Sequence, residues 1–178
     1  MNFHLRILCW LTAFSLFSIS CGREESSRSQ LFAEIFKDQQ STFRGTNLGD
    51  DISIPKQNEL PKVPKYIDSL GIVYEYGLAE GDKLFVEYYK DKNKEEESAN
   101  QVAAIIANVY LEDEITTSQL YNEIQTYLNS VEDYGLSSGS YGNYSWESRT
   151  KNNNRMEISL KLDDTKKGIT LNFIETKY

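Results

Sequence analysis

The strongest constraint on this fold is a strict alternation of apolar and polar side chains near the end of the chain. The alternation runs through residues 144–148, 156–162 and 169–173, and the residues between these stretches are rich in Asn, Asp and Gly. Because successive side chains of a strand point to opposite faces of a sheet, the pattern predicts three strands joined by turns. Each strand has one apolar face, which another element must cover.

Three further strands are predicted earlier in the chain. Residues 72–76 and 84–89 flank the segment Gly77–Asp82 (GLAEGD), and together they predict a hairpin. Residues 101–111 are apolar on both faces, so this strand is expected at the centre of the sheet.

One long helix is predicted between the two groups of strands. Thr116–Gln119 (TTSQ) has the form of a capping box, and Gly135 is a natural left-handed stop, so the helix is expected over about residues 117–134. Its apolar stripe consists of Leu120, Ile124, Tyr127, Leu128, Val131 and Tyr134.

The predicted fold is therefore α+β. An antiparallel meander sheet of about six strands in βββ-α-βββ order is covered on one face by one long amphipathic helix. The same order fits two copies of a helix-then-three-strands unit in which the first helix has been lost.

A short helix is predicted before the sheet, with Ser29 as its N-cap. Its apolar stripe is Leu31, Phe32, Ile35 and Phe36. This stripe either docks on the domain or faces a partner protein or the bilayer surface. The prolines at positions 55, 61 and 64 then predict an irregular lead-in over residues 43–64.

The beginning of the chain has the features of a leader. Met1–Arg6 is short and basic, and Ile7–Phe17 is apolar but too short to span a bilayer. The stretch Ser18–Gly22 (SISCG) resembles the lipobox of bacterial lipoproteins. The resemblance implies cleavage before Cys21 and attachment of lipid to its sulfur. The alternative is an ordinary secretory signal followed by a chance cysteine.

This resemblance divides the chain into three parts. A lipoprotein signal peptide covers residues 1–20, a lipid-anchored tether with a short amphipathic segment covers 21–43, and a single α+β domain covers 44–178. Many lipoproteins retained at the inner membrane have Asp directly after the acylated cysteine, and this chain has Gly22 there. The resemblance therefore implies the outer membrane, on the periplasmic or the cell-surface face.

The composition excludes several kinds of catalytic site. His4 and Cys9 lie in the predicted leader, so the mature chain has no imidazole and Cys21 is its sole cysteine. Ser-His-Asp and Cys-His nucleophile systems, zinc bound by His or Cys, and structural disulfides are thus excluded, and no cofactor or metal is expected. In residues 90–97, a candidate calcium loop, Glu96 stands where a glycine is required.

The net charge of the chain limits the classes of partner that it is expected to bind. The chain has 19 Lys+Arg and 27 Asp+Glu, a formal net charge of −8. A polyanion is held by basic clusters that neutralise its phosphates, so nucleic acid is not an expected partner. The expected partners are the lipid bilayer, through acylated Cys21, and an envelope protein.

Carboxylates are the abundant catalytic groups that remain. Glu75 and Glu87 lie nearly opposite each other if the predicted hairpin centres on Glu80, and paired carboxylates can hydrolyse a glycosidic bond. With 27 acidic residues such pairs are common by chance. We therefore predict that the protein is not an enzyme, and no catalytic residue is assigned.

The segment Tyr134–Ser148 (YGLSSGSYGNYSWES) has the composition of adaptable binding loops. Tyr141, Tyr144 and Trp146 are the candidate binding residues, for a protein partner or for sugar rings. Tyr144 and Trp146 lie on the same face of their strand, so the alternative is that they belong to the core beneath the helix.

Residues 116–175 resemble the envelope lipoproteins that act as accessory proteins of β-barrel assembly. The matching features are a helix that ends at Tyr134-Gly135-Leu136 and a strand with Trp146-Glu147, followed by a meander. The resemblance implies a non-enzymatic accessory subunit of an outer-membrane complex. The alternatives are a surface carbohydrate- or peptide-binding lipoprotein and, third, a small carboxylate-dependent hydrolase.

Overall fold

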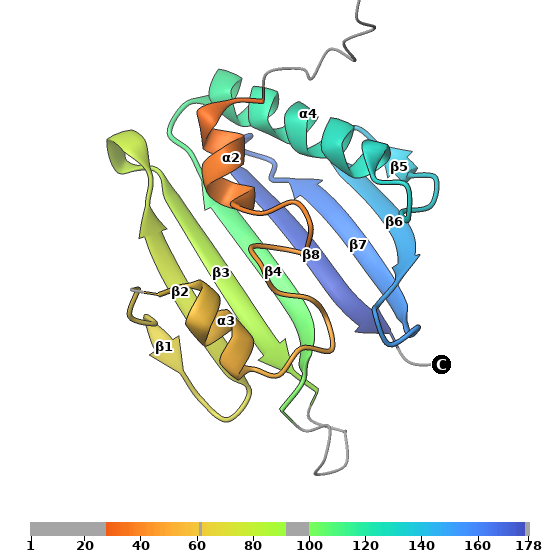
Figure 1. Ribbon diagram of the computed structural model, residues 1–178. Coiled ribbons are helices and arrows are strands. Elements are labelled where there is room, and N and C mark those ends of the chain that lie inside the picture. Colours follow the sequence, from red (N-terminus) through yellow and green to blue (C-terminus); the bar gives the residue numbers. More distant parts are fainter. Residues whose placement is uncertain (1–27, 61, 92–99, 177–178) are drawn as a thin grey trace, which may run out of the picture.

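The computed structural model describes residues 28–60, 62–91 and 100–176. These residues form one open antiparallel sheet of eight strands, with α-helices over one face (Figure 1). The predicted α+β class is thus confirmed. The predicted signal peptide, Cys21 and most of residues 90–97 lie outside the described residues. Within the described ranges, no helix is long and apolar enough to cross a bilayer.

The described helices and strands have a simple order along the chain. In order they are α2 (Gln30–Phe36), α3 (Ser53–Asn58), β1 (Tyr66–Ile67), β2 (Gly71–Gly77), the 3-10 turn η1 (Ala79–Gly81), β3 (Lys83–Lys90), β4 (Val102–Tyr110), α4 (Glu114–Ser130), β5 (Ser138–Ser140), β6 (Asn143–Arg149), β7 (Arg155–Leu162) and β8 (Gly168–Thr176).

The sheet consists of two meanders joined side by side. Its order is β1-β2-β3-β4-β8-β7-β6-β5, and the meanders meet where β4 pairs with β8. α4 connects them, so a helix precedes each group of four strands. The structure corrects the predicted six strands in βββ-α-βββ order to eight strands, four on each side of α4.

The two strands that the sequence analysis missed are β1 and β5, which form the two edges of the sheet. β1 has two residues and β5 has three, and all of them are exposed. Burial of one face produces the alternation by which strands are recognised, and these edge strands have no buried face. Short edge strands also limit pairing with other chains.

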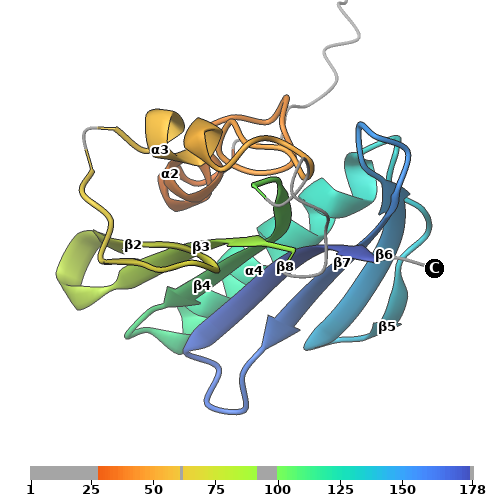
Figure 2. The ribbon, with the colours of Figure 1, turned by 90° about the horizontal axis from the view of Figure 1, so that it is seen from below.

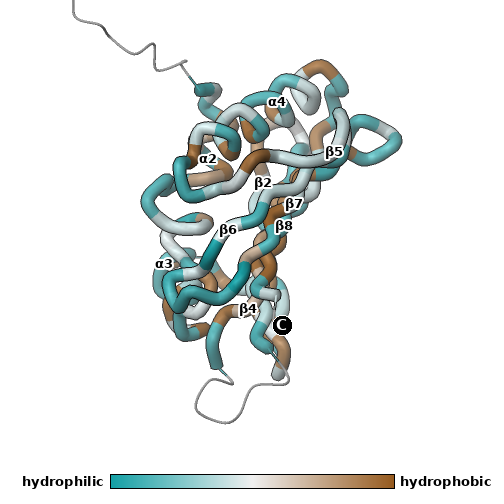
Figure 3. Tube along the Cα trace, turned by 90° about the vertical axis from the view of Figure 1, so that its right-hand side faces the viewer, coloured by the Kyte–Doolittle hydropathy of each residue, from teal (hydrophilic) through white to brown (hydrophobic). Residues whose placement is uncertain are grey.

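β4 lies at the centre of the sheet, between β3 and β8, as its two apolar faces predict. A row of buried side chains in register crosses the helix-covered face on six neighbouring strands. The row consists of Ile72, Tyr88, Ile105, Phe173, Ile158 and Trp146. Figure 3 shows apolar and polar colouring along both β7 and β8, as expected for strands with one buried face.

The opposite face of the sheet carries polar side chains that hydrogen-bond from strand to strand. The Asn108 amide donates to Glu87 on β3, and its oxygen accepts from Thr170 on β8. Asn172 donates to Ser159 on the next strand. α2 and α3 lie on the other side of the sheet (Figure 2).

α4 begins earlier and ends earlier than predicted. Its N-cap is Asp113, whose carboxylate accepts from the Thr116 backbone N–H at 2.7 Å, so the Thr116–Gln119 capping box does not form. After Ser130, Val131 is extended, a turn closed by the Tyr134 N–H and the Val131 carbonyl follows, and the Gly135 N–H donates to the Glu147 carbonyl of β6. Gly135 is therefore a close-approach residue beside β6 and not a left-handed helix stop.

α2 confirms the predicted short helix. Ser29 Oγ accepts from the Phe32 N–H at 3.1 Å and donates to Glu123 of α4. Phe32 and Phe36 are stacked on each other and pack edge-on against Tyr127 of α4. The apolar stripe therefore docks on the domain, and the core includes side chains from residues that the sequence analysis assigned to the tether.

The proline-containing lead-in is mostly irregular, as predicted, but it includes the short helix α3. Pro55 lies in the first turn of α3, where its missing N–H has no intrahelical acceptor to lose. Pro55 is also the buried residue of this helix. Because α3 is short and buries one side chain, side chains from other elements fill the region between α3 and the sheet.

Candidate functional site

A tight turn buries Arg44 between the helices and the sheet. Phe43 and Thr46 exchange two backbone hydrogen bonds of 3.0 Å, which close a turn over Arg44 and Gly45. Both turn residues have positive φ, 51° at Arg44 and 81° at Gly45, as in a type I′ turn. Arg44 thus holds a left-handed conformation that is uncommon for a residue other than glycine, and its side chain is 1% exposed.

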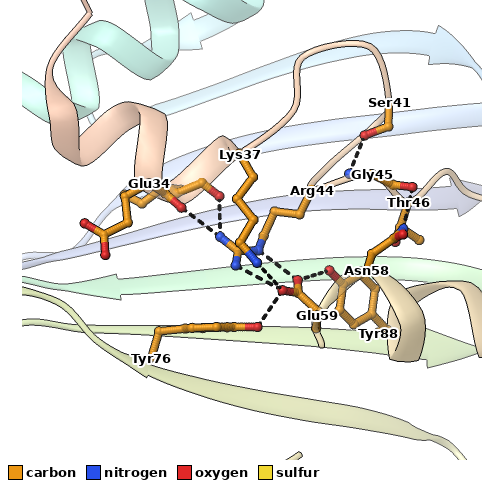
Figure 4. A network of polar contacts seen from close by, with 11 residues as sticks. Glu34, Lys37, Ser41, Arg44, Gly45, Thr46, Asn58, Glu59, Tyr76 and Tyr88 are labelled. Carbon is orange, nitrogen blue, oxygen red and sulfur yellow. Dashed lines mark hydrogen bonds and ion pairs between the residues drawn. The ribbon is translucent and has the colours of Figure 1, made fainter. Parts of the chain in front are cut away.

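Glu59 is the acceptor at the centre of the site (Figure 4). It follows α3 as the C-cap residue, and its side chain is fully buried. One carboxylate oxygen accepts from Arg44 Nε and from the Tyr88 hydroxyl, both at 2.8 Å. The other accepts from Arg44 Nη2 at 3.0 Å, Lys37 Nζ at 2.9 Å and the Tyr76 hydroxyl at 2.5 Å. Five donors therefore satisfy one buried carboxylate.

Arg44 joins this carboxylate to the end of α2. Its Nη1 donates to the carbonyls of Glu34 and Ile35 at 2.8 and 2.9 Å. Carbonyls in the last turn of a helix have no intrahelical donor, so Arg44 supplies one. The ion pair thus connects α2 and α3, and the two tyrosines connect it to β2 and β3.

The pKa values of these groups follow from burial and from the ion pair. Burial raises the pKa of Glu59, but hydrogen bonding and positive charge from Arg44, together with Tyr76 and Lys37, outweigh burial and lower it to about 2. Burial and the Glu59 carboxylate raise the pKa of Tyr76 and of Tyr88. Glu59 is therefore ionised at neutral pH, and both phenols keep their protons.

A cavity of about 530 Å³ opens beside this network. It is lined by Lys37, Glu59, Leu60, Lys62, Val63 and Tyr76. Leu60 and Val63 are 68% and 79% exposed, so apolar side chains stand at its mouth. The volume lies within the range of small-ligand pockets, about 300–1,000 Å³.

Three cations surround the aromatic ring of Tyr76. Arg44 Cζ lies 4.6 Å from the ring centre, Lys62 Nζ lies 5.3 Å from it and Lys37 Nζ lies 5.5 Å from it. The negative face of an aromatic ring attracts cations at such distances. The pocket wall is therefore positively charged, although its buried carboxylate is Glu59.

The exposed apolar side chains at the mouth continue along the chain. We call residues 60 and 62–67 the edge segment, because it leads into the edge strand β1. Tyr66 and Ile67 in this segment are 58% and 55% exposed. The edge segment thus combines exposed apolar side chains with Lys62 and Lys65.

The chemistry of this site is suited to binding. A general acid or base needs a pKa near the working pH and a free position toward its substrate. Glu59 has a pKa of about 2, and five donors surround it. The lysine ammonium groups and the apolar mouth, in contrast, can hold an anionic group next to an apolar one.

The structure places the two carboxylates that the sequence analysis paired one register step apart, on the same face of β2 and β3. Glu75 is in register with Phe85, and Glu87 is in register with Val73, so the two glutamates are diagonal neighbours. Lys65 and Lys83 form ion pairs with Glu75. Glu87 accepts from Asn108 at 3.0 Å and from the Tyr89 hydroxyl at 2.5 Å. Each carboxylate is thus engaged with its own partners.

The three candidate binding residues have different surroundings. Trp146 is 1% exposed, and its Nε1 donates to Asn129 of α4 at 2.9 Å. Tyr144 is partly buried against the core, with its ring centre 6.2 Å from that of Trp146. Tyr141 is 55% exposed and stands edge-on to Tyr121. Trp146 and Tyr144 therefore pack in or against the core, as the alternative interpretation predicted. Of the three residues, Tyr141 alone presents its ring at the surface.

Among the described residues, no group of three or more His, Cys, Asp or Glu side chains is arranged to hold a metal ion. Comparison with known proteins gives no assignment either. Neither a protein-family model, nor a curated protein, nor a solved structure matches the chain. The site therefore has to be interpreted from its own geometry.

Sequence reasoning missed the residues that form this site. Arg44 and Glu59 lie 15 positions apart in a region predicted to be irregular, and Tyr76 and Tyr88 were read only as strand residues. One local signal was present, because Arg44-Gly45 is a two-residue turn with Gly at its second position. That signal predicts a turn and does not predict that the arginine is buried.

Proposed function

We propose that this protein is a lipid-anchored envelope lipoprotein of the outer membrane, attached through Cys21, that acts as a non-enzymatic accessory subunit by binding another envelope protein. The observation that carries the binding role is the edge segment. Its exposed apolar side chains lie next to a positively charged pocket, and exposed apolar groups beside polar ones are typical of protein interaction surfaces.

The partners of the acidic side chains support a non-enzymatic role. Glu59 is surrounded by five donors, and Glu75 and Glu87 each form their own ion pairs or hydrogen bonds. A hydrolytic pair needs two carboxylates that face one substrate from about 5 to 9.5 Å apart. The observed partners do not favour the carboxylate hydrolase, which was the third alternative.

A second candidate function is the binding of carbohydrate or peptide at Tyr141. Its exposed ring is held edge-on to Tyr121, with ring centres 5.3 Å apart. An exposed, supported aromatic ring can stack on a sugar ring or contact a peptide. This function predicts ligand binding by the isolated protein, whereas an accessory subunit is retained with its partner.

The test is a mild-detergent pull-down of tagged protein from its native membranes. We expect one stoichiometric membrane protein to be retained, and we expect the Cys21→Ala variant to retain less of it. A Leu60→Ser/Val63→Ser variant should also lose the partner, whereas Leu136→Ser, which changes a fully exposed apolar residue outside the edge segment, should not. Recovery of wild-type protein without any partner would contradict the proposed function.

A further inference from the structure

We propose that the pocket beside Glu59 is the docking site for an acidic, apolar segment of the partner protein. One carboxylate of that segment is held between Lys37 and Lys62, and an adjoining apolar side chain packs on Leu60 and Val63. The inference rests on the proposed function, because it states the chemistry of the partner at that surface.

The local charge balance of the pocket favours an acidic ligand. Arg44 and Glu59 form a buried ion pair, and Lys37 shares the same carboxylate. Lys62 contacts the ring of Tyr76, so the two lysines add positive charge that Glu59 does not balance. The chain as a whole carries −8. An acidic segment is therefore attracted to this pocket and repelled by much of the remaining surface.

The polar groups of the pocket are already held in place by the Arg44–Glu59 network. Lys37 Nζ is held by Glu59 at 2.9 Å, and the Tyr76 hydroxyl is held by the same carboxylate at 2.5 Å. Arg44 fixes that carboxylate through two hydrogen bonds. Groups that are ordered before binding lose less conformational entropy when a ligand arrives.

An apolar surface lies beside the charged groups of the pocket. Leu60 and Val63 stand at the mouth of the pocket, and the edge segment extends this apolar surface to Tyr66 and Ile67. Covering exposed apolar area stabilises a complex by about 25 cal/mol per Å² before the costs of association. A ligand that has both a carboxylate and apolar side chains uses both features.

An anionic membrane surface is less suited to this site. Recognition of such a surface typically uses clusters of about four to eight Lys or Arg. Lys65 is paired with Glu75, so this site offers two lysines, Lys37 and Lys62, which are fewer than such a cluster contains. The two lysines line one pocket, which suits a single carboxylate.

The chemistry is tested with a defined peptide. Full-length protein in mild detergent is titrated by calorimetry with a capped five-residue peptide that alternates leucine and aspartate. We expect binding that is at least about tenfold weaker for the same peptide with asparagine in place of aspartate, and also at least about tenfold weaker for Lys62→Glu. Lys161→Glu is the matched control, because Lys161 is an exposed lysine on β7, away from the pocket. Equal affinity for both peptides, or an equal effect of Lys161→Glu, would overturn the inference.

Two further experiments separate the sources of failure. In the pull-down, Lys62→Glu should lose the partner and Lys161→Glu should retain it. If wild-type protein retains no partner, the proposed function fails; if Lys62→Glu retains as much partner as wild type, the inference fails while the proposed function stands. Flotation of the Cys21→Ala protein with phosphatidylglycerol vesicles tests the membrane alternative. Flotation that depends on Lys62, without binding of the acidic peptide, would replace the partner segment by a lipid headgroup.

Discussion

The two halves of the sheet have the same strand order, but different helices pack on them. In the second half, α4 has 17 residues and packs an apolar stripe over β5–β8. In the first half, α3 has six residues, and Pro55 is its buried side chain. The Arg44–Glu59 network lies over β2 and β3, where it hydrogen-bonds to Tyr76 and Tyr88, with a cavity of about 530 Å³ beside it.

The difference shows how one topology produces both a closed core and a pocket. A long amphipathic helix covers its meander with apolar contacts and leaves no charged group at the centre. A short helix cannot do so, and the buried polar groups near it must then satisfy one another. The candidate site lies in the half with the shorter helix for this reason.

The largest effect is expected from removing the buried charge in the first half. Glu59→Gln leaves the Arg44 guanidinium buried without its counter-charge, which should lower the free energy of unfolding by about 3–5 kcal/mol. Urea unfolding of Glu59→Gln measures this loss, and Glu75→Gln, which removes a partly exposed carboxylate paired with Lys65 and Lys83, is the control. A change in Glu59→Gln no larger than that in Glu75→Gln would show that the network does not stabilise the first half.

A somewhat smaller loss is expected from a cavity in the second half. Leu128 of α4 is fully buried, so Leu128→Ala should lower the free energy of unfolding by about 3 kcal/mol through lost apolar contacts. The same urea experiment measures it. The exposed Leu136 gives the control substitution Leu136→Ala, which should leave the unfolding midpoint nearly unchanged.

The pH dependence should distinguish these two losses. The pKa of Glu59 falls from 4.5 to about 2 on folding, so its contribution is fully present above pH 4.5 and is lost as the pH falls toward 2. The difference between wild type and Glu59→Gln should therefore shrink over this interval, while the difference for Leu128→Ala should stay constant. Unfolding curves at several pH values would refute this if both differences changed in parallel.

The stability of the protein at alkaline pH tests the contribution of the two phenols in the same network. Folding raises the pKa of Tyr76 and Tyr88 above 10, so their contribution is fully present below pH 10 and is lost as the pH rises further. We expect alkaline unfolding to be weaker in a Tyr76→Phe/Tyr88→Phe variant. Tyr110→Phe, on an exposed tyrosine, is the control for a general effect of phenol ionisation.

The smallest effect concerns the start of α4. Asp113→Ala removes the side chain that caps this helix and should lower the melting temperature by about 3 °C. Thr116→Ala tests the alternative capping box and should have the smaller effect, because the Thr116 hydroxyl only donates to the Asp113 carboxylate. The reverse order in thermal unfolding would favour the cap that the sequence suggested.

Local periodicity accounts for what could be predicted from the sequence. The alternation in residues 156–162 predicts β7, and the two apolar faces of residues 101–111 predict the central position of β4. Ser29 and the apolar stripe that follows it predict α2. These features depend on neighbours along the chain, which share one burial pattern, and so the sequence alone determined them.

Only the tertiary structure decided the edges of the sheet and the candidate site. β1 and β5 have no buried face and hence no periodicity, so their pairing depends on the strands beside them. Arg44 and Glu59 have the composition of surface residues, and the fold buries them by bringing α2, α3, β2 and β3 together. The physical reason is that burial of a charge depends on which distant groups surround it, and residue type does not encode those neighbours.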